Sequence, residues 1–400
     1  MSPKDNISLP LAAELARAGL VTYMNDGKPR ATIKKVRDPH TGKTTWTILS
    51  INGGGERGLI PAVFLDQVEK RTRRPIRDLF DILAGTSTGG ILVNGLSLAN
   101  CVGRPKYSAE AMVGLYDTEG PVIFKQNLLL QVWHQFIVGG AKYSASGIDG
   151  SLAKYFGNAL FKDQLGLCIV AAYETKQREA WFFKNWDPDD GARTSAYISR
   201  ATSAAPTYFP PLANGTDGGA FIDGGVAAND PALCALAEAI LLSQPGDDFL
   251  VVSVGTGKYQ KPYTYKQLNG FRLWNWAPTI LDILMDSQPQ VTNYILQKLM
   301  QLQLPQQYHE RVQRTRFYTF DCNLNAENEA MDNADPEQRA TLKQLGLSMT
   351  QGDQQAEFES MCDRVLALLE ANEAIVADKD EASEARRKAR DSARCGDGTK

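Results

Sequence analysis

Apolar and polar residues along this chain follow two alternating patterns. Short apolar runs rich in β-branched and aromatic residues predict strands, and longer runs with apolar residues at helical spacing predict helices. The predicted strands are Thr44–Ile51, Phe80–Leu83, Leu167–Tyr173, Ala180–Lys184, Ala220–Ile222, Phe249–Val254 and Arg316–Phe320. Among the predicted helices, one begins at Leu59, another covers Pro231–Leu242, a third runs from Thr279 to Leu304 with a break at Pro289, and a fourth covers Ala356–Ile375.

The order of the first elements predicts the fold class. A strand, a glycine loop, a helix, a second strand, a tight turn and a second helix follow one another between residues 44 and 97. This βαβα order is typical of a parallel sheet with right-handed crossovers, so we expect an α/β protein.

Composition narrows the class of function. The chain of 400 residues is 43% hydrophobic and 22% charged, which suffices for a sizeable core. Its net charge of -3 gives no basic footprint, so we expect no nucleic acid polymer as a partner. No apolar run reaches the roughly 18 residues of a membrane span, and the first 20 residues lack the apolar core of a signal peptide. Six scattered cysteines without a C-x-x-C pair predict a reduced, cytoplasmic protein.

Changes in composition suggest four parts. Residues 1–44 read as an accessory leader and residues 45–260 as the catalytic core. Residues 261–376 read as a helical C-terminal part packed on that core, and residues 377–400 as a charged, flexible tail.

The second predicted strand leads into Gly85-Thr86-Ser87-Thr88-Gly89, a match to G-x-S-x-G. This pattern marks a sharp strand-to-helix turn that presents a serine hydroxyl at the top of a sheet. A helix that starts after the serine directs free N–H groups and a positive dipole end toward an oxyanion formed there. Ser87 is therefore the candidate nucleophile, with Gly85 and Gly89 as its structural support.

The first predicted strand leads into a glycine loop, Asn52–Gly58. Its spacing Gly53-x-Gly55-x-x-Gly58 also matches the dinucleotide-binding pattern. That pattern needs an acidic residue at the end of the next strand, where this chain has the serine turn instead. The other interpretation is an oxyanion hole formed by the backbone N–H groups of Gly54 and Gly55, together with that of Thr88. Gly53 and Gly58 would support the loop, and Arg57 would either hold it or meet a phosphate of the substrate.

A serine nucleophile needs a base, and the three histidines fit poorly. His40, His134 and His309 do not follow a predicted strand. Asp223 ends a predicted strand and precedes Gly224 and another glycine, so its loop can approach a neighbouring backbone. Its ordinary pKa of about 3.9 is low for a base, so we expect a Ser–Asp pair to depend on geometry and on the oxyanion hole.

Together these residues resemble the patatin-like phospholipase family. The resemblance rests on Ile48–Gly58, Gly85–Gly90, Arg200–Pro210 and Asp223–Pro231, which cover roughly residues 45–260 in family order. It implies a three-layer α/β/α fold with a mostly parallel central sheet and a Ser–Asp dyad without histidine. It also implies hydrolysis of fatty-acyl esters in membrane glycerolipids, of phospholipase A or lysophospholipase type, with no cofactor or metal. Asn52 departs from plant members, which usually carry Asp there.

Two alternatives to the lipid hydrolase remain open at the level of the sequence. One is a nucleotide-binding module with an inert Ser87. The other is a patatin-like effector of a bacterial anti-phage system that a cyclic nucleotide activates. The oligomeric state and any small-molecule activator are not predicted.

We expect transient contact with a membrane surface, because the substrate lies in a bilayer. Two apolar stretches are suited to a mobile lid, Leu128–Phe136 and the aromatic residues Phe271, Trp274 and Trp276. Aromatic side chains favour the interface between lipid and water.

Overall fold

The structure is a computed structural model, and it describes residues 24–25, 28–29, 44–125, 140–215, 218–258, 263–301 and 315–396, with side chains up to residue 377. Its strands are β1 Met24–Asn25, β2 Lys28–Pro29, β3 Thr45–Ile51, β4 Ile82–Thr86, β5 Leu167–Glu174, β6 Glu179–Lys184, β7 Leu212–Asn214, β8 Gly219–Asp223, β9 Asp248–Val254 and β10 Thr315–Phe320. Its α-helices are α2 Leu59–Thr72, α3 Ile76–Leu79, α4 Thr88–Ser97, α5 Ala109–Ile123, α7 Ala145–Phe156, α8 Pro188–Gly191, α9 Ser195–Thr202, α10 Ala232–Leu242, α11 Tyr265–Asn269, α12 Leu273–Gln301, α14 Pro336–Ser348 and α15 Gln355–Gly396. Short 3₁₀ turns cover Gly55–Gly58, Phe161–Asp163, Gly224–Val226 and Gly352–Gln354.

The main sheet is mostly parallel, as the sequence predicts. Among the described residues its strands follow the order β10-β9-β3-β4-β5-β8-β7, with β6 paired to β5. The five strands from β10 to β5 pair in parallel, while β6, β8 and β7 pair antiparallel. Every predicted strand in the described residues is present, with ends shifted by no more than a few residues.

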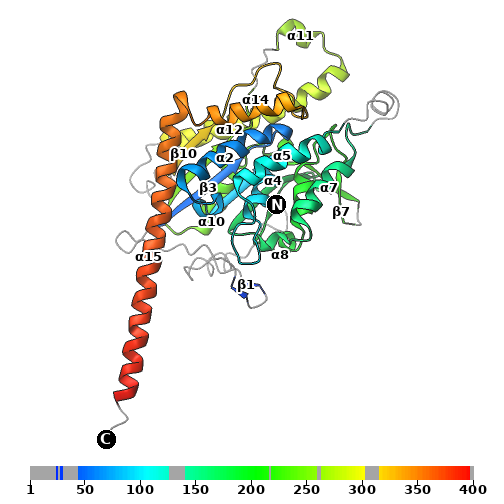
Figure 1. The fold of residues 1–400 in the computed structure, drawn as a ribbon. Helices are drawn as coiled ribbons and strands as arrows, with labels where there is room; N and C mark the ends of the chain where they lie inside the picture. The colour runs from blue at the N-terminus through cyan, green and yellow to red at the C-terminus, as the bar shows by residue number, and fades with distance from the viewer. Residues whose placement is uncertain are drawn as a thin grey trace.

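Helices cover both faces of this sheet, which makes the fold a three-layer α/β/α sandwich (Figure 1). Alternate strand residues point to opposite faces. Leu49, Ile51 and Leu83 pack into the core beneath α2 and α4. Ile48 and Ile82 pack into a second, smaller core beneath α10.

One feature of the sheet positions two strand ends against each other. On β5, Ala171 pairs with Thr86 of β4, and the next residue, Ala172, pairs with Asp223 of β8. β6 occupies the opposite edge of β5, so β4 and β8 share one edge. Because β4 runs parallel and β8 antiparallel to β5, their carboxyl ends meet.

The predicted break at Pro289 is wrong, because α12 runs unbroken from Leu273 to Gln301. A proline inside a helix leaves the carbonyl four residues earlier without its N–H partner. Here that carbonyl belongs to Met285, and it accepts a hydrogen bond of 2.9 Å from Nδ2 of Asn229. A side chain from elsewhere in the chain thus replaces the lost helical bond.

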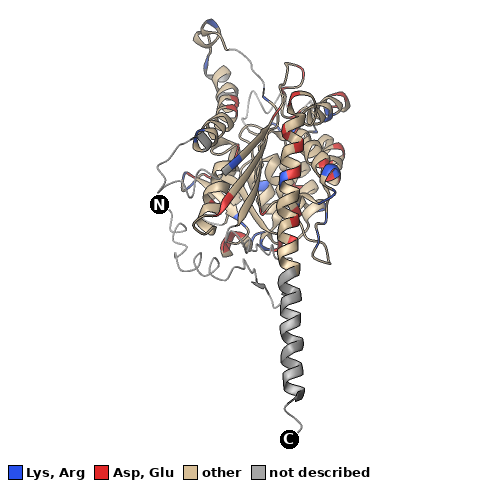
Figure 2. Cartoon of the chain, turned by 90° about the vertical axis from the view of Figure 1, so that its left-hand side faces the viewer, with Lys and Arg blue, Asp and Glu red and all other residues tan. Residues whose placement is uncertain are grey.

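The last helix is longer than its sequence pattern predicts. α15 continues to Gly396, about twenty residues past Ile375, and extends away from the body of the molecule (Figure 1). Acidic residues lie along its described part (Figure 2), and Glu359 and Asp363 pair with Arg71 of α2 at 2.5 and 2.7 Å. These exposed ion pairs fix the side on which α15 lies and contribute little stability.

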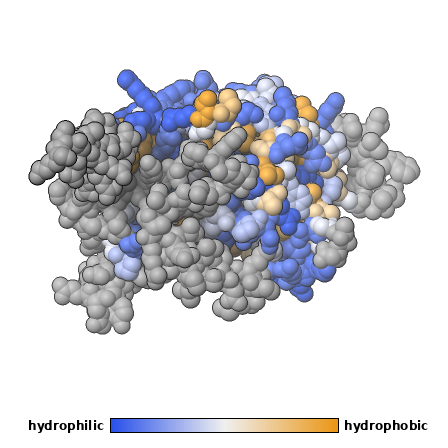
Figure 3. Space-filling model, turned by 90° about the horizontal axis from the view of Figure 1, so that it is seen from below, coloured by the Kyte–Doolittle hydropathy of each residue, from blue (hydrophilic) through white to orange (hydrophobic). Residues whose placement is uncertain are grey.

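Two aspects of the surface bear on membrane contact. No helix among the described residues combines the length and the apolar character needed to cross a membrane. Seen from below, the described surface is largely hydrophilic, with hydrophobic residues in small separate groups (Figure 3). Most of the predicted leader, residues 1–44, lies outside the described residues.

Candidate active site

Ser87 sits on the turn between β4 and α4, as the G-x-S-x-G pattern predicts. Its backbone has φ 54° and ψ -122°, which is a strained conformation for a residue with a side chain. The turn needs glycine on both sides. A Cβ on Gly85 would lie 2.3 Å from the Gly89 carbonyl oxygen, and a Cβ on Gly89 would lie 2.1 Å from that of Ile51.

Thr202 of α9 fixes this strained turn from the other side. Its Oγ1 accepts a hydrogen bond of 2.7 Å from the backbone N–H of Ser87 and donates to the Ala171 carbonyl. The elbow is therefore tied to β5, the strand that also carries β8.

The glycine loop lies next to the elbow, since β3 pairs with β4. Gly53 is anchored through its N–H to the Asn229 carbonyl at 3.2 Å and through its own carbonyl to Thr256 Oγ1 at 2.7 Å. The backbone N–H groups of Gly54, Gly55 and Thr88 find no acceptor among the described residues. These three amides are the ones that the sequence predicts for an oxyanion hole. Gly58 packs under Thr88, where a Cβ would lie 2.1 Å from Thr88 Oγ1.

Asp223 ends β8 and is almost completely buried, with 2% of its surface exposed. Its Oδ1 accepts a hydrogen bond of 2.7 Å from the Gly225 N–H, and its Oδ2 has no partner of good geometry among the described residues. Burial raises the pKa of Asp223 to about 6, and hydrogen bonding from the Ser87 side chain and Gly225 opposes this rise. Gly224 permits the close approach to β5, since a Cβ there would lie 2.4 Å from the Ala171 carbonyl oxygen.

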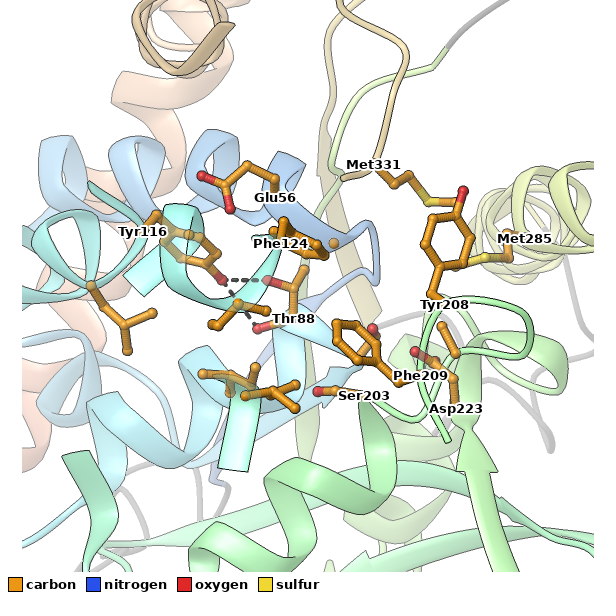
Figure 4. A pocket seen from close by; sticks show the side chains of 18 of the residues that line it. Glu56, Thr88, Tyr116, Phe124, Ser203, Tyr208, Phe209, Asp223, Met285 and Met331 are labelled. Atoms are coloured by element: carbon orange, nitrogen blue, oxygen red, sulfur yellow. Dashed lines mark hydrogen bonds between the residues drawn. The ribbon is translucent and has the colours of Figure 1, made fainter. Parts of the chain in front are cut away.

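Ser87, Thr88, Gly55 and Asp223 line one pocket, although 136 residues of sequence separate Ser87 from Asp223. Figure 4 shows Tyr208, Met285 and Met331 on one side of the pocket and Glu56, Tyr116 and Phe124 on the other. The rest of the lining is mainly apolar and includes Ile91, Leu115, Ile123, Ile148, Phe209 and Leu281.

Sequence reasoning missed Glu56 and Tyr116 as residues of this pocket. Glu56 is buried at 1% exposure, and burial raises its pKa to about 8. Its Oε1 has no hydrogen-bond partner among the described residues. The Tyr116 hydroxyl hydrogen-bonds to Thr88 Oγ1 (Figure 4). Tyr116 lies on α5, a helix that the sequence pattern did not predict.

Arg57 is also buried, but its side chain lies outside the apolar pocket. It lines two polar cavities and does not line the apolar pocket. One of its terminal nitrogens donates to the Glu329 carbonyl at 3.4 Å, and its Nε has no partner among the described residues. Burial lowers the pKa of Arg57, and the nearby carboxylates of Asp286, Asp321 and Asp282 oppose this effect.

Several predicted residues lie outside the described part of the chain. They are His40, His134, His309, the stretch Leu128–Phe136 and the side chain of Trp274. Of the predicted aromatic group, Phe271 and Trp276 are half-buried and pack edge to face at 5.5 Å.

The sequence of this chain is similar to those of known proteins. The profile of the patatin-like phospholipase family matches residues 49–236. Patatin-like protein 1 of Arabidopsis thaliana is 32% identical over 300 residues, which are 65% of this chain and 72% of that protein. Patatin-17 of Solanum cardiophyllum is 28% identical over 83% of this chain and 92% of its own length. Among solved structures, the type III effector protein ExoU aligns with a TM-score of 0.32 and 10% identity, over 87% of this chain and 62% of that one.

The fold and the sequence matches define a hydrolase that acts on carboxylic esters of lipids. The chain belongs to the patatin-like phospholipase family. The interpretation as a nucleotide-binding module is thereby replaced by that of a lipid acyl hydrolase.

Proposed function

We propose that this protein cleaves fatty-acyl esters of membrane glycerolipids as a phospholipase A or lysophospholipase, with Ser87 as nucleophile and Asp223 as base. The observation that carries the proposal is the meeting of β4 and β8 on β5. It brings a serine on a strained elbow next to a buried carboxylate that keeps one oxygen free of other hydrogen bonds.

The first step forms an acyl-enzyme. Ser87 Oγ attacks the ester carbonyl carbon while Asp223 takes its proton. The negative charge that develops on the carbonyl oxygen is stabilised by the free amides of the oxyanion hole, Gly54, Gly55 and Thr88. The alcohol then leaves with the proton from Asp223. Water, activated by the same carboxylate, releases the fatty acid.

The raised pKa of Asp223 makes this dyad more effective than its residue types suggest. A carboxylate with a pKa near 4 is a weak base at neutral pH, whereas one with a pKa of about 6 is closer to the operating pH. It remains ionised at pH 7 and is therefore ready to accept the proton.

The shape and chemistry of the pocket support a fatty-acyl substrate. Its apolar lining from α4, α5, α7 and α12 suits an alkyl chain that enters beside Ser87. A cyclic-nucleotide trigger stays a prediction from the resemblance.

Replacement of the nucleophile tests this function. We expect Ser87→Ala to abolish fatty-acid release from phospholipid vesicles, measured by lipid mass spectrometry, while the thermal midpoint stays within a few degrees of the wild type. A folded Ser87→Ala protein with near wild-type turnover would disprove the proposal.

Membrane contact is best placed on α12. One side of this helix contributes Leu281 and Met285 to the acyl pocket. Its other side exposes apolar side chains at helical spacing, and their exposed fractions lie between 37% and 63%: Ile280, Ile283, Leu284, Val291, Tyr294 and Ile295. Such a stripe next to the pocket can insert at a lipid surface and deliver the substrate.

A polar substitution in this stripe separates membrane contact from chemistry. We expect Val291→Asp to lower hydrolysis of vesicles about tenfold, because a charge at the lipid interface costs roughly 1–2 kcal/mol. Hydrolysis of a soluble short-chain ester should change little. Leu241→Asp, which places the same charge on an exposed residue of α10, is the matched control. Equal losses on vesicles for both variants would exclude α12 as the contact.

A further inference from the structure

A polar groove opens next to the acyl pocket. It shares Tyr208, Met285 and Met331 with that pocket, so the two cavities adjoin. The groove has a free volume of about 250 Å³, and the rest of its lining is mostly charged or aromatic: Arg57, Tyr263, Asp282, Asp286, Glu329 and Asp332. In a glycerophospholipid the head group follows directly on the acylated glycerol, so this groove is where the head group would extend.

The floor of the groove carries one buried cation. Arg57 follows Gly55 by two residues and is 7% exposed, and its Nε has no partner among the described residues. In the groove a phosphodiester would meet Arg57. Its charge would restore part of the solvation that burial removes from the guanidinium.

Among the residues that line the groove, carboxylates outnumber cations. Asp282 and Asp286 lie one helical turn apart on α12, and both line the groove. The Asp286 carboxylate has no ion pair or hydrogen bond of its side chain within the described residues, and it acts on Arg57 through space. Asp332, in contrast, already forms an ion pair with Lys142 and accepts a hydrogen bond of 2.7 Å from the Tyr143 hydroxyl. Asp286 is thus the carboxylate with free capacity for a cation.

Two aromatic rings also line the groove. Tyr208 and Tyr263 line the groove together with the carboxylates. The face of an aromatic ring attracts an ammonium group, and more strongly where water is partly excluded.

We propose that this groove is a head-group subsite that selects phospholipids bearing an ammonium group, with Asp286 as counter-ion and Tyr208 and Tyr263 as the aromatic walls. The inference rests on the proposed hydrolase function, since it assigns the part of the same substrate that lies outside the acyl pocket. Beside the pocket that would take the acyl ester, the groove offers Arg57 to the phosphate and Asp286 to the ammonium of such a lipid. An anionic head group without an ammonium would meet the carboxylates uncompensated.

The test uses short-chain lipids that stay monomeric, which removes the membrane surface from the comparison. Fatty-acid release from dihexanoyl phosphatidylcholine, dihexanoyl phosphatidylglycerol and p-nitrophenyl hexanoate is measured below their critical micelle concentrations. We expect wild-type kcat/KM to favour the choline lipid over the glycerol lipid by about fivefold or more, the size of one partly exposed ion pair. Asp286→Asn should remove most of this preference, and Asp286→Lys should reverse it.

The matched control is Asp353→Asn, which removes the same charge from an exposed residue outside the groove and should keep the wild-type preference. The proposal is overturned if the wild type hydrolyses both lipids equally, or if Asp286→Asn lowers kcat/KM for both by the same factor. In that second case Asp286 only neutralises Arg57. If none of the three esters is hydrolysed in a Ser87-dependent way, the hydrolase function itself is overturned. Hydrolysis of p-nitrophenyl hexanoate without a head-group preference would overturn the subsite alone.

Discussion

The two ends of the segment between β8 and α10 each carry a buried aspartate, and the two are bonded very differently. Asp223 and Asp230 are both 2% exposed. Asp230 accepts hydrogen bonds from the Ser50 hydroxyl at 2.7 Å, the Ser253 hydroxyl at 2.7 Å and the Ala232 N–H at 3.0 Å. Both of its oxygens are therefore occupied.

Asp223 accepts one hydrogen bond of good geometry from the described residues, on Oδ1, and its Oδ2 faces the pocket region without one. Burial raises the pKa of both aspartates, so the direction of the pKa shift does not distinguish them. What distinguishes them is free hydrogen-bonding capacity next to the proposed nucleophile, Ser87. A saturated buried carboxylate holds strands together, and an unsaturated one in a pocket can exchange a proton.

The largest expected effect tests Asp223. Asp223→Asn should lower kcat/KM by about a thousandfold or more, because an amide cannot take the Ser87 proton. It should not lower stability. The folded-state pKa of about 6 lies above the ordinary 3.8, so the stability contributed by the protonated form is full below pH 3.8 and is lost as pH rises through 6.

Fatty-acid release and a thermal scan at pH 7.5 measure the two effects. The amide avoids a cost of up to about 3 kcal/mol for the buried charge, so the thermal midpoint should be equal or higher. An active variant, or an inactive one that is also strongly destabilised, would remove the distinction between the two aspartates.

The next effect in size belongs to Asp230. Asp230→Ala leaves the Ser50 and Ser253 hydroxyls and the Ala232 N–H without their acceptor, so the free energy of unfolding should fall by about 3 kcal/mol. Turnover per folded molecule should stay within a few-fold of the wild type. Urea denaturation measures the free energy of unfolding, and active-site titration combined with fatty-acid release measures the turnover per folded molecule. A selective loss of turnover would place Asp230 in the chemistry instead.

The smallest effect concerns a third buried carboxyl, Glu56. The activity profile should have an acidic limb near pH 6, where Asp223 becomes protonated, and an alkaline limb near pH 8, where Glu56 ionises inside the acyl pocket. Each limb should change kcat/KM about tenfold per pH unit. Glu56→Gln should remove the alkaline limb and leave the acidic one. A profile that is identical in both proteins would show that Glu56 does not face the acyl chain.

Sequence reasoning succeeded where the constraint is local. The elbow at Ser87 follows from Gly85 and Gly89, whose lack of a side chain lets the backbone reverse. The position of Asp223 at the end of β8 also follows from a local signal, a strand end followed by glycines, while its role as base stays a prediction. The parallel order of β3 and β4 follows from the helix between them.

Sequence reasoning failed where the outcome depends on distant partners. Pro289 does not break α12, because Asn229, sixty residues earlier, satisfies the carbonyl that the proline leaves free. Glu56 stands between the recognised glycines of the loop, and only the packing of α5 against the loop places it in the pocket. The pKa of Asp223 depends on its burial, which the sequence does not specify.

The junction of β4 and β8 on β5 also bears on when a growing chain can acquire the proposed activity. Ser87 leaves the ribosome before Thr202, which ties the elbow to β5, and Thr202 leaves before Asp223. The proposed proton acceptor arrives only when β8 docks in register beside Ala172, which is a contact between distant parts of the chain and therefore a late one. Unfinished or truncated chains that end before β8 carry the proposed nucleophile without its proposed base. On the proposed mechanism, such chains lack hydrolase activity.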